Sequence, residues 1–286
     1  MSTLMSALSE LGLILGFEFM RNAFAAATIV AIVAGAVGYF LVLRGETFAG
    51  HALAHVGFPG ATGAALIGLS PFTGLTIFTI LAGLGIGLLG ERAHRDVAIG
   101  MVLTLSLGLG LLFLHFYTAY ASQATSLLFG NVLAIDRGTL AALAGLSAVS
   151  LVALGAIARP LLFASLQPEL AEAKGLRLPL VSALFMTIAA IATAATMQIV
   201  GVLLVFALMV APAASAMRLT RHIGTGIALA IGLALAIAWS SLILAFFTDW
   251  PTSFWITALG TLVFVASAGW KRMVSRRRSA PVSAAA

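Results

Sequence analysis

The 286-residue sequence contains no cysteine, so it can form neither a disulfide nor a thiolate metal site. Any metal ligands must be histidine, carboxylate, amide or backbone groups. Charged residues are also scarce, at 8%, against about 25% in a soluble domain. Hydrophobic residues reach 62%, against the usual level of about 45–50%. This composition excludes an ordinary soluble domain and predicts a chain that lies in a lipid bilayer.

Long uncharged stretches are the dominant pattern. Each is long enough for a helix to cross about 30 Å of hydrocarbon. We therefore expect an all-α integral membrane protein with eight or nine transmembrane helices. The count depends on the N-terminal segment and on residues 115–138, which are ambiguous. The expected spans are residues 23–43, 47–69, 72–89, 97–114, 139–158, two within 178–217, 223–247 and 252–270.

Three segments are expected along the chain. Residues 1–22 lack a basic start and a small-residue cleavage site, so they do not resemble a cleaved signal peptide. Their few charges among Leu, Ile and Phe suggest an interfacial helix. Residues 23–270 form one transmembrane domain, and residues 271–286 form a basic cytoplasmic tail.

The net charge of +6 is explained by membrane topology and not by nucleic acid, so no nucleic-acid partner is expected. With nine spans and a cytoplasmic C-terminus, every lysine and arginine except Arg21 and Arg137 falls on the cytoplasmic side. Basic residues collect on that side of membrane proteins. The distribution predicts a multi-pass protein of the inner (cytoplasmic) membrane.

The sequence also lacks the glycine-rich phosphate loop that ends in lysine. Its two lysines, Lys174 and Lys271, lie outside any such loop. We therefore expect no enzyme activity in this chain. If it takes part in energised transport, ATP is hydrolysed by a separate subunit.

One short motif carries metal-binding chemistry. In "GHALAH", His51 and His55 are four residues apart, so on a helix both imidazoles project from one face. The spacing is that of the zinc-protease motif H-E-x-x-H, but Ala52 replaces the glutamate that would activate water. The pair can bind a metal without hydrolytic chemistry. Alternatively, the two histidines hydrogen-bond neighbouring helices.

Proline follows the histidine pair. Pro59 lacks the N–H that would bond the carbonyl of His55, and Gly60 comes next, so the helix is expected to kink or break. Freed backbone groups are tolerated at membrane depth only where protein or a water-filled cavity satisfies them. The kink at Pro59 and Gly60 is therefore predicted to face a pore.

Three blocks of the sequence resemble the membrane permease subunits of ABC importers for zinc, manganese and iron. The first is "FLVLRGETFAGHALAHVGFPGATGAALIG" at residues 40–68, in which an arginine ends one span and a histidine motif opens the next. The others are "DVAIGMVLTLSLGLGLLFL" with "SLLFGNVLAI", and "VGVLLVFALMVAPAASAMRL". The resemblance implies a permease that works with an ABC ATPase, an extracytoplasmic metal-binding protein and a second permease copy.

The resemblance also implies a metal site at His51 and His55. The family usually has aspartate at the position of His51, and exchanging a carboxylate for an imidazole favours zinc over manganese. A homodimer would bring four imidazoles to the pathway. Zinc is then the expected transported substrate, and no permanently bound cofactor is expected. Whether nearby Glu46 attracts cations stays open at this point.

The cytoplasmic loop at residues 159–178 is predicted to contact the ATPase. It contains a short helix that begins at Pro168. From composition alone, this is an ordinary interfacial helix. In the resembling family, an equivalent segment is the coupling helix, which docks on the ATPase. The corresponding residues here are Gln167, Glu169, Glu172 and Gly175.

Four other functions are weighed against zinc import. A manganese or iron importer of the same family differs only in its metal. An ATP-independent metal transporter would need acidic residues at mid-span, and the hydrophobic runs contain almost none. An intramembrane metalloprotease lacks its base at Ala52. An importer of iron chelates or cobalamin hides its metal from protein ligands, which leaves the histidine pair without a purpose.

Overall fold

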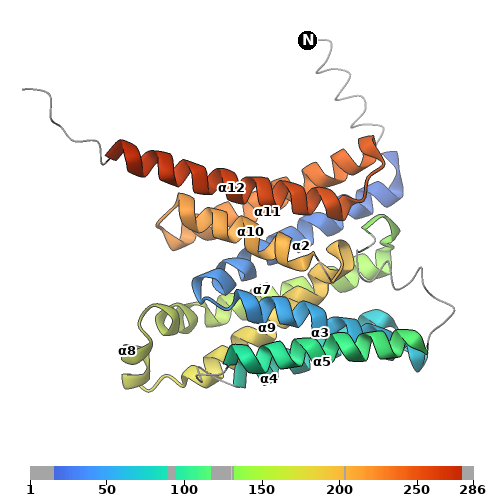
Figure 1. Cartoon of the computed structure of the whole chain (residues 1–286), viewed down its shortest axis with the longest axis horizontal. Helices are drawn as coiled ribbons and strands as arrows, with labels where there is room; N and C mark the ends of the chain where they lie inside the picture. The colour runs from blue at the N-terminus through green and yellow to red at the C-terminus, as the bar shows by residue number, and fades with distance from the viewer. Residues whose placement is uncertain (1–15, 89–94, 117–129, 131, 203, 279–286) are drawn as a thin grey trace, which may run out of the picture.

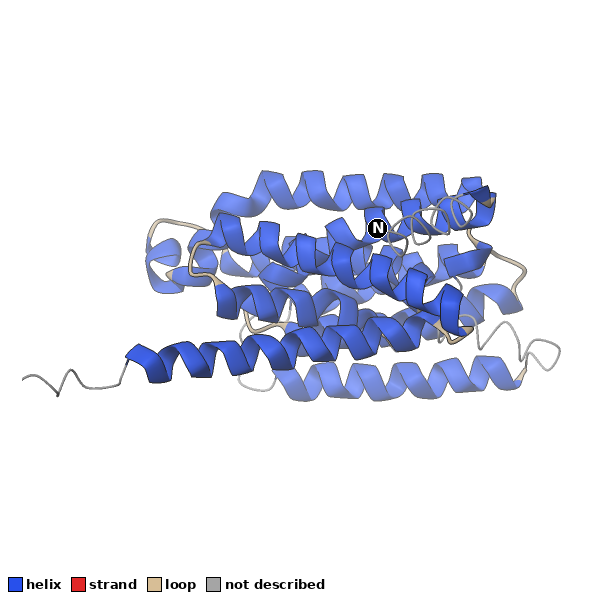
Figure 2. Cartoon of the chain, turned by 90° about the horizontal axis from the view of Figure 1, so that it is seen from above, coloured by secondary structure: helices blue, strands red, loops and turns tan. Residues whose placement is uncertain are grey.

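The computed structural model describes residues 16–88, 95–116, 130, 132–202 and 204–278. These residues form helices and no strand. Nine long helices run roughly side by side (Figures 1 and 2). They are α2 (Glu18–Leu43), α3 (Thr47–Leu66), α4 (Pro71–Leu88), α5 (Arg95–His115), α7 (Arg137–Leu166), α9 (Leu178–Val200), α10 (Val205–Leu219), α11 (Ile223–Thr248) and α12 (Thr252–Arg278). The short α8 (Pro168–Ala173) and the 3₁₀ turn η1 (Val132–Ala134) complete the described elements.

The number of helices agrees with the predicted eight or nine spans. Seven of the described helices are long and apolar enough to cross a membrane by themselves. The other two are α3, with 20 residues, and α10, with 15 residues. Their neighbours in the bundle are full-length spans, so the predicted all-α membrane fold is confirmed.

The predicted boundaries are shifted in places. The expected interfacial helix at residues 1–22 lies mostly outside the described residues, and its last part, from Glu18, is the first turn of α2. At the other end, α12 continues through the start of the predicted basic tail to Arg278. Much of the ambiguous region 115–138 also lies outside the described residues.

The helices form two groups that share a buried centre. On one side, α2 packs against α7, α10 and α11; on the other, α3 and α9 pack against α4, and α5 covers α3. The most hydrophobic stretches of α2 and α9 are 72% and 67% buried, whereas that of α5 is only 17% buried. Exposed apolar side chains on the outer helices face the lipid, so the centre of the bundle must hold the polar groups that work inside the membrane.

The predicted topology places α8 and the C-terminal end of α12 on the cytoplasmic side. Figure 1 shows both at the same end of the bundle, where α2 also ends and α3 begins. The turns that precede α7 and α12 lie at the opposite, external end. The histidine helix α3 therefore starts at the cytoplasmic end and runs outward.

Candidate functional site

The predicted histidine pair lies on one face of α3. The Nε2 atoms of His51 and His55 are 3.3 Å apart. The two ring centroids are 4.6 Å apart, with the rings nearly perpendicular. The structure therefore brings the two predicted ligands together, with their Nε2 atoms facing each other.

The pair has one buried member and one partly open member. His55 is only 7% exposed, and its Nδ1 atom is buried without a hydrogen-bond partner. His51 is partly buried, and its ring meets the edge of Phe206 on α10 at 5.4 Å between centroids. Buried polar atoms are nearly always paired, so the orphan Nδ1 marks His55 as a residue kept for more than packing.

The histidine pair by itself is too small a ligand set to hold a metal ion. Within the described residues, no group of three or more His, Cys, Asp or Glu side chains is placed to hold a metal ion. The two imidazoles thus leave the remaining coordination positions to water, backbone groups or another molecule. An incomplete ligand set suits an ion that must be released after binding.

Of the two outcomes predicted at Pro59, a break does not occur, since α3 continues through Pro59 as one helix. The pore-facing kink at Pro59 and Gly60 stays a prediction. The hydroxyl of Thr62 donates to the carbonyl of Phe58 at 3.0 Å, so this polar side chain is satisfied within the helix. Gly60 is buried against α4, where an added Cβ would lie 2.5 Å from the carbonyl oxygen of Gly74. Gly60 therefore permits a close helix contact, as small residues do in membranes.

Sequence reasoning left the role of Glu46 open, and the structure answers it. Its carboxylate pairs with Arg44, with 3.1 Å between Arg44 Nε and Glu46 Oε2. Both side chains are almost completely buried, at 7% and 6% exposed. Glu46 precedes the first residue of α3, so this ion pair lies at the cytoplasmic start of the histidine helix.

The predicted coupling residues lie within α8 and next to its two ends. Gln167 ends α7 and also precedes α8, Pro168 is the first residue of α8, and Glu169 lies in the first turn. Gly175 has φ +83°, and the turn closes with hydrogen bonds from Gly175 N to Glu172 O and from Leu176 N to Ala171 O. Glycine suits this left-handed position because it has no Cβ. Gln167, Glu169, Glu172 and Gly175 are all exposed.

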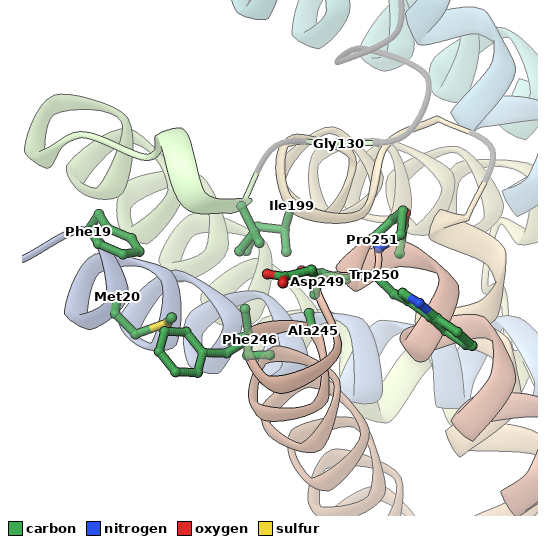
Figure 3. A pocket seen from close by; sticks show the side chains of 13 residues that line it. Phe19, Met20, Gly130, Ile199, Ala245, Phe246, Asp249, Trp250 and Pro251 are labelled. Atoms are coloured by element: carbon green, nitrogen blue, oxygen red, sulfur yellow. The ribbon is translucent and has the colours of Figure 1, made fainter. Parts of the chain in front are cut away.

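A separate cavity of about 620 Å³ opens at the external end. It lies among the starts of α2 and α12 and the ends of α9 and α11 (Figure 3). Asp249, at φ 54°, directs its carboxylate toward the lining residues. None of the predicted site residues lines this cavity, and no motif in the sequence pointed to it.

Comparison with known proteins identifies the family. The model of the ABC 3 transport family matches residues 16–271, nearly the whole chain. The chain belongs to the ABC 3 transport family. This membership confirms the resemblance drawn from the three sequence blocks.

Relatives within this family agree with the assignment. The chain is 33% identical to the manganese transport system membrane protein MntC of Halalkalibacterium halodurans, over 79% of this chain and 78% of the relative. It is 31% identical to a protein of Haemophilus influenzae described as a probable iron transport system membrane protein, over 91% and 96% of the two chains. Neither of these names mentions zinc.

A solved structure of the family supports the fold. PsaBC from Streptococcus pneumoniae, in complex with a Fab, contains a chain that superposes with a TM-score of 0.81. The two chains are 28% identical, and the match covers 91% of this chain and 95% of that one. This ABC 3 transport protein is therefore a multi-pass permease of the cytoplasmic membrane.

Proposed function

We propose that the chain is the permease subunit of an ATP-driven importer that moves a divalent transition metal into the cytoplasm. The observation that carries this function is the pair of facing imidazoles on α3, inside a chain of the ABC 3 transport family. Nucleotide chemistry belongs to a separate ATPase, since the chain has no phosphate loop. The permease itself is a transport subunit and not an enzyme.

Manganese or iron is the first candidate cargo, because the names of two relatives concern these metals. Zinc is a second candidate, which a specific observation favours. Tetrahedral zinc with bonds of about 2.0–2.1 Å places two nitrogen ligands about 3.3 Å apart. The Nε2 atoms of His51 and His55 have this separation. A hydrogen bond between the two imidazoles fits the same distance, so the zinc preference stays a prediction.

A second copy of the chain is the partner that would complete the site. The two imidazoles of one chain leave coordination positions unfilled, and the His51 side of α3 is partly open. A homodimer around this face would bring four imidazoles together, as the sequence predicted. An extracytoplasmic metal-binding protein would deliver the ion at the external end.

The ATPase is proposed to dock on α8. The segment is exposed and cytoplasmic, and its polar side chains stand beside the exposed apolar residues Leu166 and Leu170. An apolar centre with a polar rim is the usual composition of a protein interface. Gln167, Glu169, Glu172 and Gly175 therefore remain the proposed coupling residues.

Replacing both histidines tests the function. The double variant His51→Ala/His55→Ala should lose uptake of radiolabelled manganese, iron and zinc, because the imidazoles that hold the ion are gone. His222→Ala is the matched control, since His222 lies in an exposed turn before α11. Uptake at the wild-type rate in the double variant, with the protein inserted normally, would refute the proposal.

The metal is decided by a second substitution at the same position. His51→Asp restores the family's usual carboxylate, and manganese prefers oxygen ligands. If the wild type imports zinc, this variant should shift uptake toward manganese. A wild type that imports manganese or iron and excludes zinc would remove zinc as a candidate without affecting the importer function.

A further inference from the structure

The turn between α2 and α3 holds Arg44 and Glu46 in fixed positions. Gly45 has φ +68°, and the N–H groups of Gly45 and Glu46 donate to the carbonyls of Val42 and Leu41. This pair of bonds is a Schellman motif, which ends α2 abruptly at Leu43 and lets α3 begin at Thr47. The backbone thus places the two side chains next to each other.

The Arg44 guanidinium makes four hydrogen bonds. Nε and Nη2 donate to the two carboxylate oxygens of Glu46, at 3.1 and 3.2 Å. Nη1 donates to the hydroxyl of Ser165 at 3.1 Å, and Nη2 donates to the hydroxyl of Ser182 at 2.8 Å. The ring of Phe185 lies 5.5 Å away. A planar arginine fork can make this set of bonds, whereas the single nitrogen of lysine cannot.

The two serines lie on either side of the proposed ATPase-docking segment. Ser165 is in the last turn of α7, directly before α8, and Ser182 is near the start of α9, directly after it. The helices that precede and follow α8 are therefore bonded to the same guanidinium. A shift of α8 that moves the ends of α7 or α9 must change these bonds.

The same guanidinium also bonds Glu46, which is close in the sequence to the proposed metal ligands. Glu46 directly precedes α3, and its carbonyl accepts from Gly50 N at 3.0 Å. His51 follows five residues after Glu46, about 7–8 Å along the helix axis. Because a helix moves largely as a rigid rod, a displacement at Glu46 reaches His51 and His55.

From these contacts we infer that Arg44 is a positioning residue that links the α8 segment to the histidine pair of α3. This inference rests on the proposed function, because it assumes that α8 receives the ATPase and that the histidines bind the ion. Coupling between distant sites can be carried by a contiguous hydrogen-bond network. A single buried guanidinium bonded to Glu46 at the start of α3, to Ser165 of α7 and to Ser182 of α9 supplies such a network.

The alternative is that Arg44 only holds the helices together. Coupling and stability are separated by variants that keep the fold. Arg44→Lys retains the positive charge beside Glu46 but loses the fork. Arg44→Met/Glu46→Gln removes both buried charges and keeps side chains of similar size. Arg137→Met is the matched control. Arg137 also joins α2 to α7, but at the external end and through an ion pair with Glu18.

The first measurement follows α8 directly in the purified chain. Because the sequence has no cysteine, the variant Ala173→Cys carries a single thiol, at an exposed position of α8. Its rate of alkylation by a bulky maleimide is measured with and without the metal that the wild type imports. The metal should change this rate, and the change should disappear with Arg44→Lys or with Arg44→Met/Glu46→Gln. It should persist with Arg137→Met.

The second measurement is the number of ATP molecules hydrolysed per ion imported, in vesicles that contain the chain and its co-purified ATPase. Coupling factors between sites are typically about 5- to 150-fold. The Arg44 variants should raise this ratio at least about fivefold while still co-purifying with the ATPase. An unchanged ratio and an unchanged alkylation response in folded variants would overturn the inference. Failure of the wild type to bind or import any of the three metals would instead refute the proposed function.

Discussion

The two ends of the α2 and α7 helices are both joined by an arginine, but in different surroundings. At the external end, Arg137 of α7 pairs with Glu18 of α2 at 2.7 Å, and the side chains are 82% and 56% exposed. At the cytoplasmic end, Arg44 follows α2 and bonds Ser165 of α7 and Glu46, with its side chain 7% exposed. The same two helices are thus joined by an ion pair in solvent at one end, and at the other by a hydrogen bond from an arginine that is also in a buried ion pair with Glu46.

This difference separates a contact that is proposed to transmit a conformational change from one that only holds two helices together. An exposed ion pair is screened by water and contributes at most about 1 kcal/mol. A buried charge has to keep its partners, since losing one leaves the other uncompensated. The buried arginine lies between the proposed ATPase contact and the metal ligands. The exposed one is the first residue of α7 and pairs with Glu18, and neither is among the predicted site residues.

The largest predicted effect is on stability at the buried arginine. Arg44→Ala removes the guanidinium that pairs with the buried Glu46 carboxylate, and breaking a buried ion pair typically costs about 3–5 kcal/mol. Arg137→Ala should cost less than about 1 kcal/mol, because its partner Glu18 is exposed and remains hydrated. Thermal unfolding of the detergent-purified variants measures the two losses side by side. Equal losses at the two ends would contradict the comparison.

Two glycines with positive φ allow the same comparison between the cytoplasmic end and the external end. Gly175, after α8, and Gly68, after α3 at the external end, have φ +83° and +75°. Both close the same kind of turn, and an added Cβ would meet nothing at either position. Alanine at either site therefore costs about 1–2 kcal/mol of left-handed strain and no steric clash.

Their effects on assembly should differ. Gly175→Ala changes the turn that holds the proposed docking segment, so it should reduce co-purification of the ATPase and transport. Gly68→Ala should lose similar stability with normal assembly. If both variants assemble equally well, the docking role of α8 is wrong.

The sequence predicted what depends on local spacing. Uncharged stretches of 18 or more residues revealed the spans, because a bilayer requires that length of apolar helix. Spacing of four residues placed His51 and His55 on one face, and the structure confirms their proximity. Glycine and proline around α8 marked the ends of that helix for the same local reason.

Contacts between distant segments were beyond sequence reasoning. Ser165 and Ser182 are 121 and 138 residues from Arg44 in the sequence. Nothing in the sequence around either serine distinguishes it from the other serines of the chain. A helix break was one of the two outcomes that local chemistry predicted at Pro59, and it does not occur. Packing of α3 between α4, α5 and α9 keeps the helix continuous.

The smallest predicted effect concerns the external end and pH. The Asp136 side chain accepts a hydrogen bond from Thr139 N at 3.0 Å and caps α7. The pKa of Asp136 lies below its usual value of 3.8. The larger cause is a hydrogen bond from the side chain of Thr139, and the second is the hydrogen bond from its backbone. Because the pKa of Asp136 is lower in the folded chain than in the unfolded chain, the ionised carboxylate stabilises the fold at pH values above the unfolded pKa. This stabilisation is lost as the pH falls through the folded pKa.

Comparison with Asp136→Asn isolates this effect, because asparagine caps a helix equally well but carries no charge. The wild type should be slightly more stable than Asp136→Asn at neutral pH, since the ionised carboxylate also favours the positive end of the helix. The difference should begin to shrink as the pH falls below the usual aspartate pKa and vanish below the lowered pKa of the folded protein. A difference that persists at low pH would show that hydrogen bonding alone, and not the charge, stabilises the start of α7.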